Sequence, residues 1–272
     1  MPYSLLCHSP LVVAILITDP LFYLLAIPAV TLVGLAKGGF SGLGMIATPL
    51  LALVVPPLEG AAILLPILIV QDIISVWNYH RAWSAWNLKV LLPGSVLGVG
   101  GGWLFAIYFS NAVIELTIGS IALVFVLQTW FGSWRRAYRG EPPAKPRRPP
   151  AAMGIVWGAL SGFTSTLVQV GSPPFQIHML PQRLDKLTLV GTTVIFFAVL
   201  NWMKVIPYFA LGQFSPRNLA TSAVLLPLAV ATNFLGFWLV RRTPTEAFYR
   251  IAYLLMALIA IALLWQGAHG LG

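Results

Sequence analysis

The chain consists of long apolar runs separated by short breaks, and this pattern constrains its fold more than any other feature. An α-helix needs about 20 apolar residues to cross the roughly 30 Å hydrocarbon core of a bilayer. Only 8% of the residues are charged, whereas soluble proteins carry about 25%. The chain therefore has too few charged side chains to cover a surface that faces water. We therefore predict an all-α polytopic membrane protein. Its full-length spans are predicted at 20–37, 60–79, 88–108, 111–131, 186–207, 217–240 and 245–266.

Shorter apolar pieces occur near the start of each half. After the first span, the break Gly38-Gly39-Phe40-Ser41-Gly42 leads to a piece at 43–55. As a helix this piece would be roughly 20 Å long, too short to cross the membrane alone. In the second half, short pieces are predicted at 152–165 and 166–180. We expect each half to begin with a helical hairpin of short or broken helices, followed by three transmembrane helices.

Motifs of the first half recur in the same order in the second half. Gly39-Phe40-Ser41-Gly42 resembles Gly162-Phe163-Thr164-Ser165, and Thr48-Pro49-Leu50 resembles Ser172-Pro173-Pro174. Their common order indicates an internal duplication, which is typical of secondary transporters. The predicted organisation is an N-terminal membrane repeat at 1–131, a basic linker at 132–151 and a C-terminal membrane repeat at 152–272.

The positions of the basic residues indicate the topology. If each half begins with a hairpin, 14 of the 16 Lys and Arg residues lie on the side of the linker, and only Lys204 and Arg217 lie nearer the other side. If each half has four crossings, Arg183 and Lys186 move opposite the linker and Lys37 falls in mid-membrane. The excess of Lys and Arg on cytoplasmic loops favours the hairpin arrangement. It makes the halves inverted repeats, with a cytoplasmic linker and with Lys37 on the cytoplasmic side.

The glycine-rich breaks are the candidate substrate site. A broken helix inside a membrane offers free N–H groups and a positive dipole end to an anion, and nearby hydroxyls add donors. The alternative interpretation is tight helix packing, because Gly34, Gly38 and Gly42 recur every four residues. The same spacing at Gly94 and Gly98 favours packing there. The candidate substrate-binding residues are Gly39, Phe40, Ser41, Gly42, Thr48, Ser161, Gly162, Thr164, Ser165, Gln169, Gly171, Ser172, Gln176 and Lys204.

Ionisable residues within the apolar runs are the candidates for coupling transport to protons. Asp72 lies in the middle of the span at 60–79, where charge is costly and usually functional. Lys204, in the matching span, could attract the anion, pair with Asp72 or reach the outer surface. His178, in the second hairpin, could titrate near neutral pH. Asp185 stands at a predicted helix start and is interpreted as a cap.

Other functional classes have little support in the sequence. The basic residues lie between apolar spans rather than in a patch with aromatic residues, so nucleic acid is not the expected partner. The four histidines have no ligand spacing, and no metal or other cofactor is predicted. An intramembrane enzyme would need a nucleophile and base, or metal ligands, at membrane depth. A purely structural subunit would not require two matched breaks.

The motifs resemble those of the TauE/SafE family of sulfite and organosulfonate exporters, also called anion permeases. The resemblance rests on the segment from Gly34 to Gly44, on Thr48-Pro49-Leu50 and on the second copy from Gly158 to Ser165. It covers nearly the whole chain. The second copy departs from the usual glycine-rich pattern in the segment from Leu167 to Pro174.

The resemblance implies a bacterial inner-membrane exporter of sulfite, sulfoacetate or a related small anion, coupled to the proton gradient. Protons, membrane lipid and a small anion would then be its partners, and a homo-oligomer is compatible with the sequence. The mechanism we expect is alternating access, with the anion held between the two hairpins. The alternatives are an importer of another small organic anion, or a channel.

Overall fold

The computed structural model describes residues 16–17, 19–40, 43–52, 54–105, 110–140 and 146–270. Within these residues all regular structure is helical, as the apolar runs predict. Helices of the first half are α2 (Pro20–Gly38), η1 (Leu43–Ile46), α3 (Ala47–Ala52), α4 (Pro57–Tyr79), α5 (Ala85–Phe105) and α6 (Asn111–Tyr138). Helices of the second half are α7 (Ala151–Val168), α8 (Ser172–Met179), η2 (Leu180–Gln182), α9 (Lys186–Ala210), α10 (Pro216–Arg242) and α11 (Thr245–His269).

Several helices are long enough to cross a membrane. Among the described residues, four are both long and apolar enough by composition, and they lie at Pro20–Gly38, Glu59–Tyr79, Lys186–Ala210 and Pro216–Arg242. By contrast, α3 and α8 have 6 and 8 residues, so they extend only about 9 and 12 Å. Neither can cross alone. This confirms a polytopic membrane protein in which full-length helices are accompanied by short ones.

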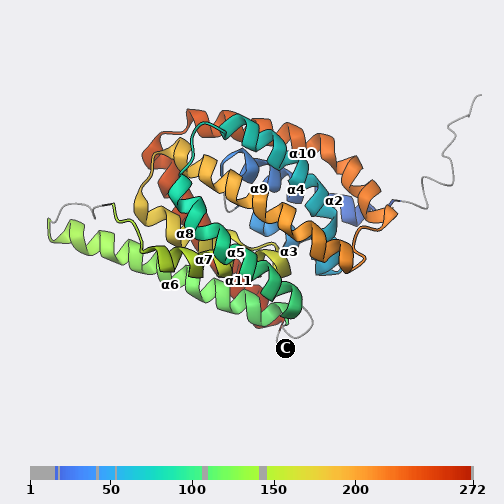
Figure 1. Ribbon diagram of the computed structural model, residues 1–272, viewed down its shortest axis with the longest axis horizontal. Helices are drawn as coiled ribbons and strands as arrows, with labels where there is room; N and C mark the ends of the chain where they lie inside the picture. The colour runs from blue at the N-terminus through green and yellow to red at the C-terminus, as the bar shows by residue number, and fades with distance from the viewer. Residues whose placement is uncertain are drawn as a thin grey trace, which may run out of the picture.

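Helices of one half pack mainly against helices of the other half. α5 lies along α7, α10 lies along α2, α4 lies against α9, and α6 lies against α11. Figure 1 shows α6 and α11 together on one side of the molecule, apart from the group formed by α2, α4, α9 and α10. In the order along each half, α2 corresponds to α7, α4 to α9, α5 to α10 and α6 to α11. If every helix is replaced by its counterpart, the same four pairs result.

Glycines allow the closest of these helix pairs to form. A Cβ added to Gly38 of α2 would lie 2.3 Å from the Gly236 Cα of α10. A Cβ on Gly98 of α5 would lie 2.0 Å from the carbonyl oxygen of Ala159 in α7. Contacts of this length admit no side chain, so small residues determine where these helices meet. The packing interpretation of Gly94 and Gly98 is confirmed.

The second helix break lies later than the sequence predicts. We expected the hairpin pieces at 152–165 and 166–180, but α7 continues to Val168 and the break covers 169–171. Gly162 is inside the helix, where a Cβ would lie 2.4 Å from the carbonyl oxygen of Ser95. It permits contact between α5 and α7 rather than a turn. Gln169, in the left-handed conformation with φ of 58°, ends the helix.

The ends of several helices share one face with the linker. The Arg147 N–H donates to the carbonyl oxygen of Pro181 in η2 (3.1 Å), and the Arg148 guanidinium lies 4.1 Å from the Trp86 ring centroid at the start of α5. Lys186 at the start of α9 donates to the carbonyl oxygen of Val240 near the end of α10 (2.8 Å). The start of α9 and the end of α10 are therefore adjacent.

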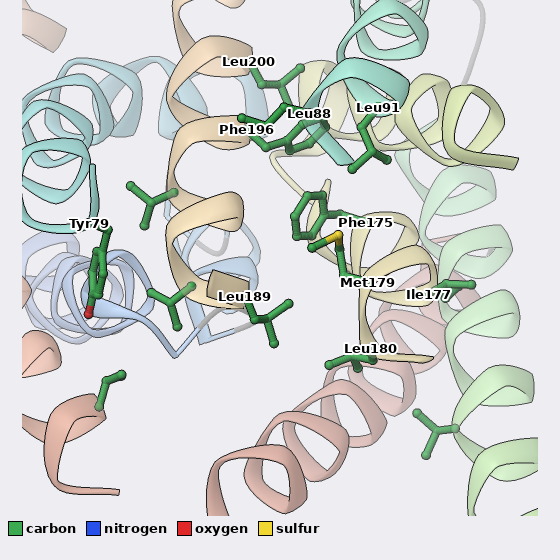
Figure 2. Close-up of a cluster of buried hydrophobic side chains, with 14 of the residues drawn as sticks. Tyr79, Leu88, Leu91, Phe175, Ile177, Met179, Leu180, Leu189, Phe196 and Leu200 are labelled. Atoms are coloured by element: carbon green, nitrogen blue, oxygen red, sulfur yellow. The ribbon is translucent and has the colours of Figure 1, made fainter. Parts of the chain in front are cut away.

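An aromatic cluster holds the second hairpin between its neighbours. Phe175 of α8 stacks on Phe196 of α9, with ring centroids 4.8 Å apart. Figure 2 shows Phe175 beside Met179 of the same helix, on the side where α9 carries Phe196. Leu88 of α5 belongs to the same buried cluster. Close van der Waals packing and ring stacking, rather than removal of apolar surface from water, keep the short α8 in place within the membrane.

Candidate functional site

A cavity of about 90 Å³ lies between the two helix breaks. This volume accommodates a small ion with some of its water, because about 10–15 Å³ of such space holds one water molecule. Both halves contribute to its wall. The lining residues are Val33, Ala36, Lys37, Gly44, Thr48, Leu64 and Leu68 from the first half, and Ser165, Gln169, Ser172, Thr193, Val194, Phe197 and Asn201 from the second.

A buried ion pair lies at the cavity, and Lys37 is its lining member. The Lys37 ammonium in the last turn of α2 binds the Asp72 carboxylate in the middle of α4. The side-chain amide of Asn201 in α9 donates to the other carboxylate oxygen at 2.7 Å. A buried charge is tolerated only when it is paired and hydrogen-bonded, and Asp72 meets both conditions. Lys37 is therefore buried inside the protein. The prediction from the charge pattern, which placed it on the cytoplasmic side, is wrong.

Lys204 is a second buried lysine, bonded to two residues of the cavity lining. It is completely buried in α9. Its ammonium donates to the Ser165 hydroxyl (3.1 Å) and to the side-chain carbonyl oxygen of Gln169, and both of these residues line the cavity. Within the described residues Asp72 forms its direct ion pair with Lys37 and not with Lys204, and the complete burial of Lys204 shows that it does not reach the surface.

Two polar groups in the lining are buried without a hydrogen-bond partner in the described structure. They are the hydroxyl oxygen of Thr48 and the amide nitrogen of Gln169. The Lys204 ammonium donates a hydrogen bond to the side-chain carbonyl oxygen of Gln169. The NH₂ group of Gln169 is therefore available as a donor. An unpaired buried polar group costs about 1–3 kcal/mol. Two unpaired donor groups at one cavity favour a ligand that accepts hydrogen bonds.

Ser172 adds a third hydroxyl to the lining. Its oxygen accepts a hydrogen bond from the Gln176 amide at 3.1 Å, so its own O–H remains a donor. Pro173 and Pro174 follow it in the first turn of α8. Because proline has no N–H, the start of α8 offers fewer backbone donors than we expected of a half-helix. Donors to an anion at this end are therefore mainly side chains.

The carbonyl groups that the breaks expose are capped by the neighbouring long helices. At the end of α2, Ser75 donates to the carbonyl oxygen of Lys37 (3.1 Å) and Tyr79 to that of Gly38 (2.7 Å). At the end of α7, Tyr208 donates to the carbonyl oxygen of Thr166 at 3.4 Å. Backbone groups at membrane depth need such partners, so α4 and α9 make the breaks possible.

The C-terminal halves of α4 and α9 can be aligned without a gap. Residues 70–80 read VQDIISVWNYH and residues 199–209 read VLNWMKVIPYF, so Tyr79 corresponds to Tyr208 and Asp72 to Asn201. Ser75 then corresponds to Lys204. The same offset of 129 relates the lining residues Leu64 and Leu68 to Thr193 and Phe197.

Lysine and serine exchange places between the halves. In the first half the lysine is on the broken helix (Lys37) and the serine on the long one (Ser75), whose hydroxyl binds the Lys37 carbonyl oxygen. In the second half the serine is on the broken helix (Ser165) and the lysine on the long one (Lys204). Each half therefore brings one buried lysine to the cavity, whereas Asp72 has the neutral Asn201 at the matching position.

Several predicted site residues are not part of the cavity lining. The Ser161 hydroxyl donates to the carbonyl oxygen of Gly171 at 2.6 Å, across the second break. Gly39 ends α2 with φ of 138°, a conformation that favours glycine. Phe40 packs, partly buried, against the aromatic cluster. Thr164 donates to the carbonyl oxygen of Leu160 within its own helix (2.8 Å). Ser41 and Gly42 are outside the described residues.

His178 belongs to a different polar cluster, near the linker. Its Nε2 is 3.0 Å from the side-chain oxygen of Asn87, and its ring stacks on Trp86 with centroids 5.9 Å apart. The Gln182 amide donates to the same Asn87 oxygen at 2.8 Å. This cluster joins α5 to α8 and η2. The coupling role of His178 stays a prediction.

Lys37 and Asn201 are cavity residues that the sequence analysis did not select. Lys37 was counted as a topology signal because it stands at the end of an apolar run. Asn201 is an ordinary polar residue in an apolar span, and its own sequence neighbourhood does not mark it as a site residue. The alignment of residues 70–80 with 199–209 was the available signal, because it places Asn201 opposite Asp72.

Broken helices from both halves, a buried cavity and buried lysines together define a polytopic membrane protein built to hold a small anion. The family model described as "Sulfite exporter TauE/SafE" matches residues 26–263. The chain belongs to the TauE/SafE family, which is a family of membrane transporters rather than enzymes. Comparison with curated proteins and with solved structures finds no match.

Proposed function

We propose that this protein is a secondary transporter that exports a small sulfur-containing anion, such as sulfite, sulfoacetate or a related organosulfonate, in a proton-coupled manner. The cavity carries the proposal. It lies between both halves and combines Lys37 with unpartnered donor groups on Thr48 and Gln169. Several oxygen atoms of a sulfite or sulfonate group can accept hydrogen bonds from these donors, and the buried lysines provide the opposite charge.

Alternating access between two inverted halves is the proposed mechanism. The helix pairs are unchanged when equivalent helices are exchanged. The side chain of Arg241, near the end of α10, donates to Asn78, near the end of α4, at 3.0 Å. Lys186 ties the start of α9 to the end of α10. The end of α4 is thus near the start of its counterpart α9, as in an inverted repeat with its site near the midplane.

The proposed location is a bacterial inner membrane, with the linker in the cytoplasm. Lys37 and Lys204 are both buried in the site, so neither counts as a topology signal. Arg217 is then the one Lys or Arg that the hairpin arrangement assigns to the side opposite the linker. This asymmetry supports the orientation.

Thermal stabilisation of the purified protein by sulfite, methanesulfonate, sulfoacetate, sulfate and acetate tests the substrate class. A ligand that binds only the folded state raises the melting temperature by mass action. We expect sulfite and methanesulfonate to raise the melting temperature and the same compounds to be transported by proteoliposomes. A response to acetate with none to any sulfur anion would instead favour a transporter of organic anions.

Paired threonine variants test the position of the site. Thr48→Val removes an unpartnered hydroxyl from the cavity, and we expect the substrate to bind about fivefold to tenfold more weakly. Thr164→Val is the matched control, because that hydroxyl bonds to its own helix, and its affinity should be near wild type. Equal affinity in both variants would reject this cavity as the site.

Asp72 is proposed to take part in proton coupling through its contact with Lys37. In proteoliposomes, Asp72→Asn is expected to move substrate down its own gradient but not to accumulate it in response to a pH difference. Accumulation driven by pH at the wild-type level would exclude Asp72 as the coupling group.

A further inference from the structure

The charges around the cavity do not balance. Among the described residues, the buried charged side chains are Lys37, Asp72 and Lys204. Lys37 and Asp72 form a direct ion pair, whereas Lys204 is held by the neutral side chains of Ser165 and Gln169. Because the charges of Lys37 and Asp72 compensate each other, the Lys204 ammonium lacks an anionic partner among the described residues, and a bound anion with one negative charge would supply it.

Asn201 accounts for the imbalance. It stands where a counterpart of Asp72 would stand, one turn before Lys204 in α9, and it lines the cavity. Its amide donates to the Asp72 carboxylate at 2.7 Å. A carboxylate at this position would give each half one lysine and one acid, and the site would be neutral. The neutral amide instead leaves one positive charge for a ligand to match.

We infer that the cavity selects anions carrying a single negative charge over those carrying two, and that Asn201 is a specificity-determining residue for this choice. This inference deepens the proposed function and rests on it for the location of the site. One negative charge brings the sum of site and ligand to zero. A second charge would remain uncompensated in a buried site, where its interactions are poorly screened.

Methanesulfonate and sulfate are suitable probes of the inference. They have similar size and sulfur–oxygen geometry, but near neutral pH methanesulfonate carries one negative charge and sulfate carries two. Nitrate adds a singly charged anion without sulfur. Dissociation constants for all three are measured on the purified full-length protein by isothermal titration calorimetry, at one pH and constant ionic strength.

We expect the wild-type protein to bind methanesulfonate at least about tenfold more tightly than sulfate. Asn201→Asp should weaken methanesulfonate binding by about tenfold or more, because it makes the site neutral. Asn201→Ser is the matched control: it shortens the side chain without adding charge, so the preference for methanesulfonate over sulfate should persist. Lys204→Gln reaches the same neutral charge from another residue and should also weaken binding.

The wild-type measurement alone can overturn the inference, so the test does not depend on every variant folding. Sulfate bound as tightly as methanesulfonate would overturn it, as would wild-type affinity in a folded Asn201→Asp variant. A third outcome is that the protein binds nitrate but neither sulfur anion, and that Asn201→Asp abolishes nitrate binding. This outcome would reject the proposed substrate class but support the selection of singly charged anions. No binding of any of the three anions to the wild-type protein would reject both.

Discussion

The Tyr79 hydroxyl donates a 2.7 Å hydrogen bond to the carbonyl oxygen of Gly38, and so caps the end of α2 inside the protein. The last carbonyl groups of any helix lack partners within the helix. Here the helix ends beside a buried cavity, and a side chain from α4 replaces water as the donor. Tyr208 in α9 bonds in the same way to the carbonyl oxygen of Thr166 in α7.

Removal of the Tyr79 hydroxyl should destabilise the first break. Tyr79→Phe keeps the ring but leaves the Gly38 carbonyl buried without this donor, which costs about 1–3 kcal/mol. We expect a lower melting temperature in detergent. Tyr138→Phe is the control, because Tyr138 is exposed and its hydroxyl should matter little. Equal melting temperatures for the two variants would contradict the capping role.

The Lys37–Asp72 pair should show strong energetic coupling. Lys37→Met leaves the buried Asp72 carboxylate without its cation, and loss of one partner of a buried pair costs about 3–5 kcal/mol. The double variant with Lys37→Met and Asp72→Leu should be more stable than Lys37→Met alone. Denaturant unfolding of the single and double variants forms a double-mutant cycle. Additive effects would show that the two side chains do not interact.

Two glycines in α5 should respond oppositely to alanine. In Gly98→Ala the new Cβ would lie 2.0 Å from the Ala159 carbonyl oxygen, and the overpacking should cost about 1–3 kcal/mol. In Gly100→Ala no atom lies within 4 Å of the new Cβ, so stability should be unchanged or higher. Melting temperatures in one detergent make the comparison. A larger loss in Gly100→Ala would contradict the α5–α7 contact.

Asp185 should make stability depend on pH in acid. Partial burial raises the pKa of its carboxyl, but hydrogen bonds from Thr188 and Leu187 lower the pKa by a larger amount. The net pKa therefore lies below the ordinary value of 3.8. A depressed pKa stabilises the folded state above pH 3.8, and this contribution is lost as the pH falls through the folded-state value.

Variants at Asp185 separate the charge from the cap. The side chain accepts from the Thr188 N–H at 3.0 Å and begins α9, so Asp185→Ala should cost about 1 kcal/mol near neutral pH. Asp185→Asn keeps a capping oxygen without a titrating group. Its difference from wild type should shrink below pH 3.8. A difference that stays constant into strong acid would exclude Asp185 as the titrating group.

The sequence predicted the elements that depend on local composition. The long spans follow from apolar run length, so α4 and α9 were found within a few residues. The first break was also found, because Gly39 lies within a run of glycines and ends α2. Asp185 was correctly expected to be a cap. Each of these features is set by a few neighbouring residues.

The second break was misplaced for a physical reason. Gly162 resembles a break in sequence, but its missing side chain serves contact with Ser95 in a helix of the other half. A glycine needed for a turn and a glycine needed for close packing look alike in one sequence. Gln169, which does end the helix, has no such signal because it is an ordinary polar residue in a left-handed conformation.

By itself, the sequence determined that the chain is a polytopic membrane protein and predicted that it has two similar halves, because apolar run length and the order of motifs are properties of the chain alone. Only the tertiary structure decided that Lys37 pairs with Asp72 and that Asn201, 129 residues after Asp72, donates to the same carboxylate. Whether a lysine at the end of an apolar run faces water or a buried carboxylate depends on which helix packs against it. That depends on contacts between the two halves, which local patterns do not encode.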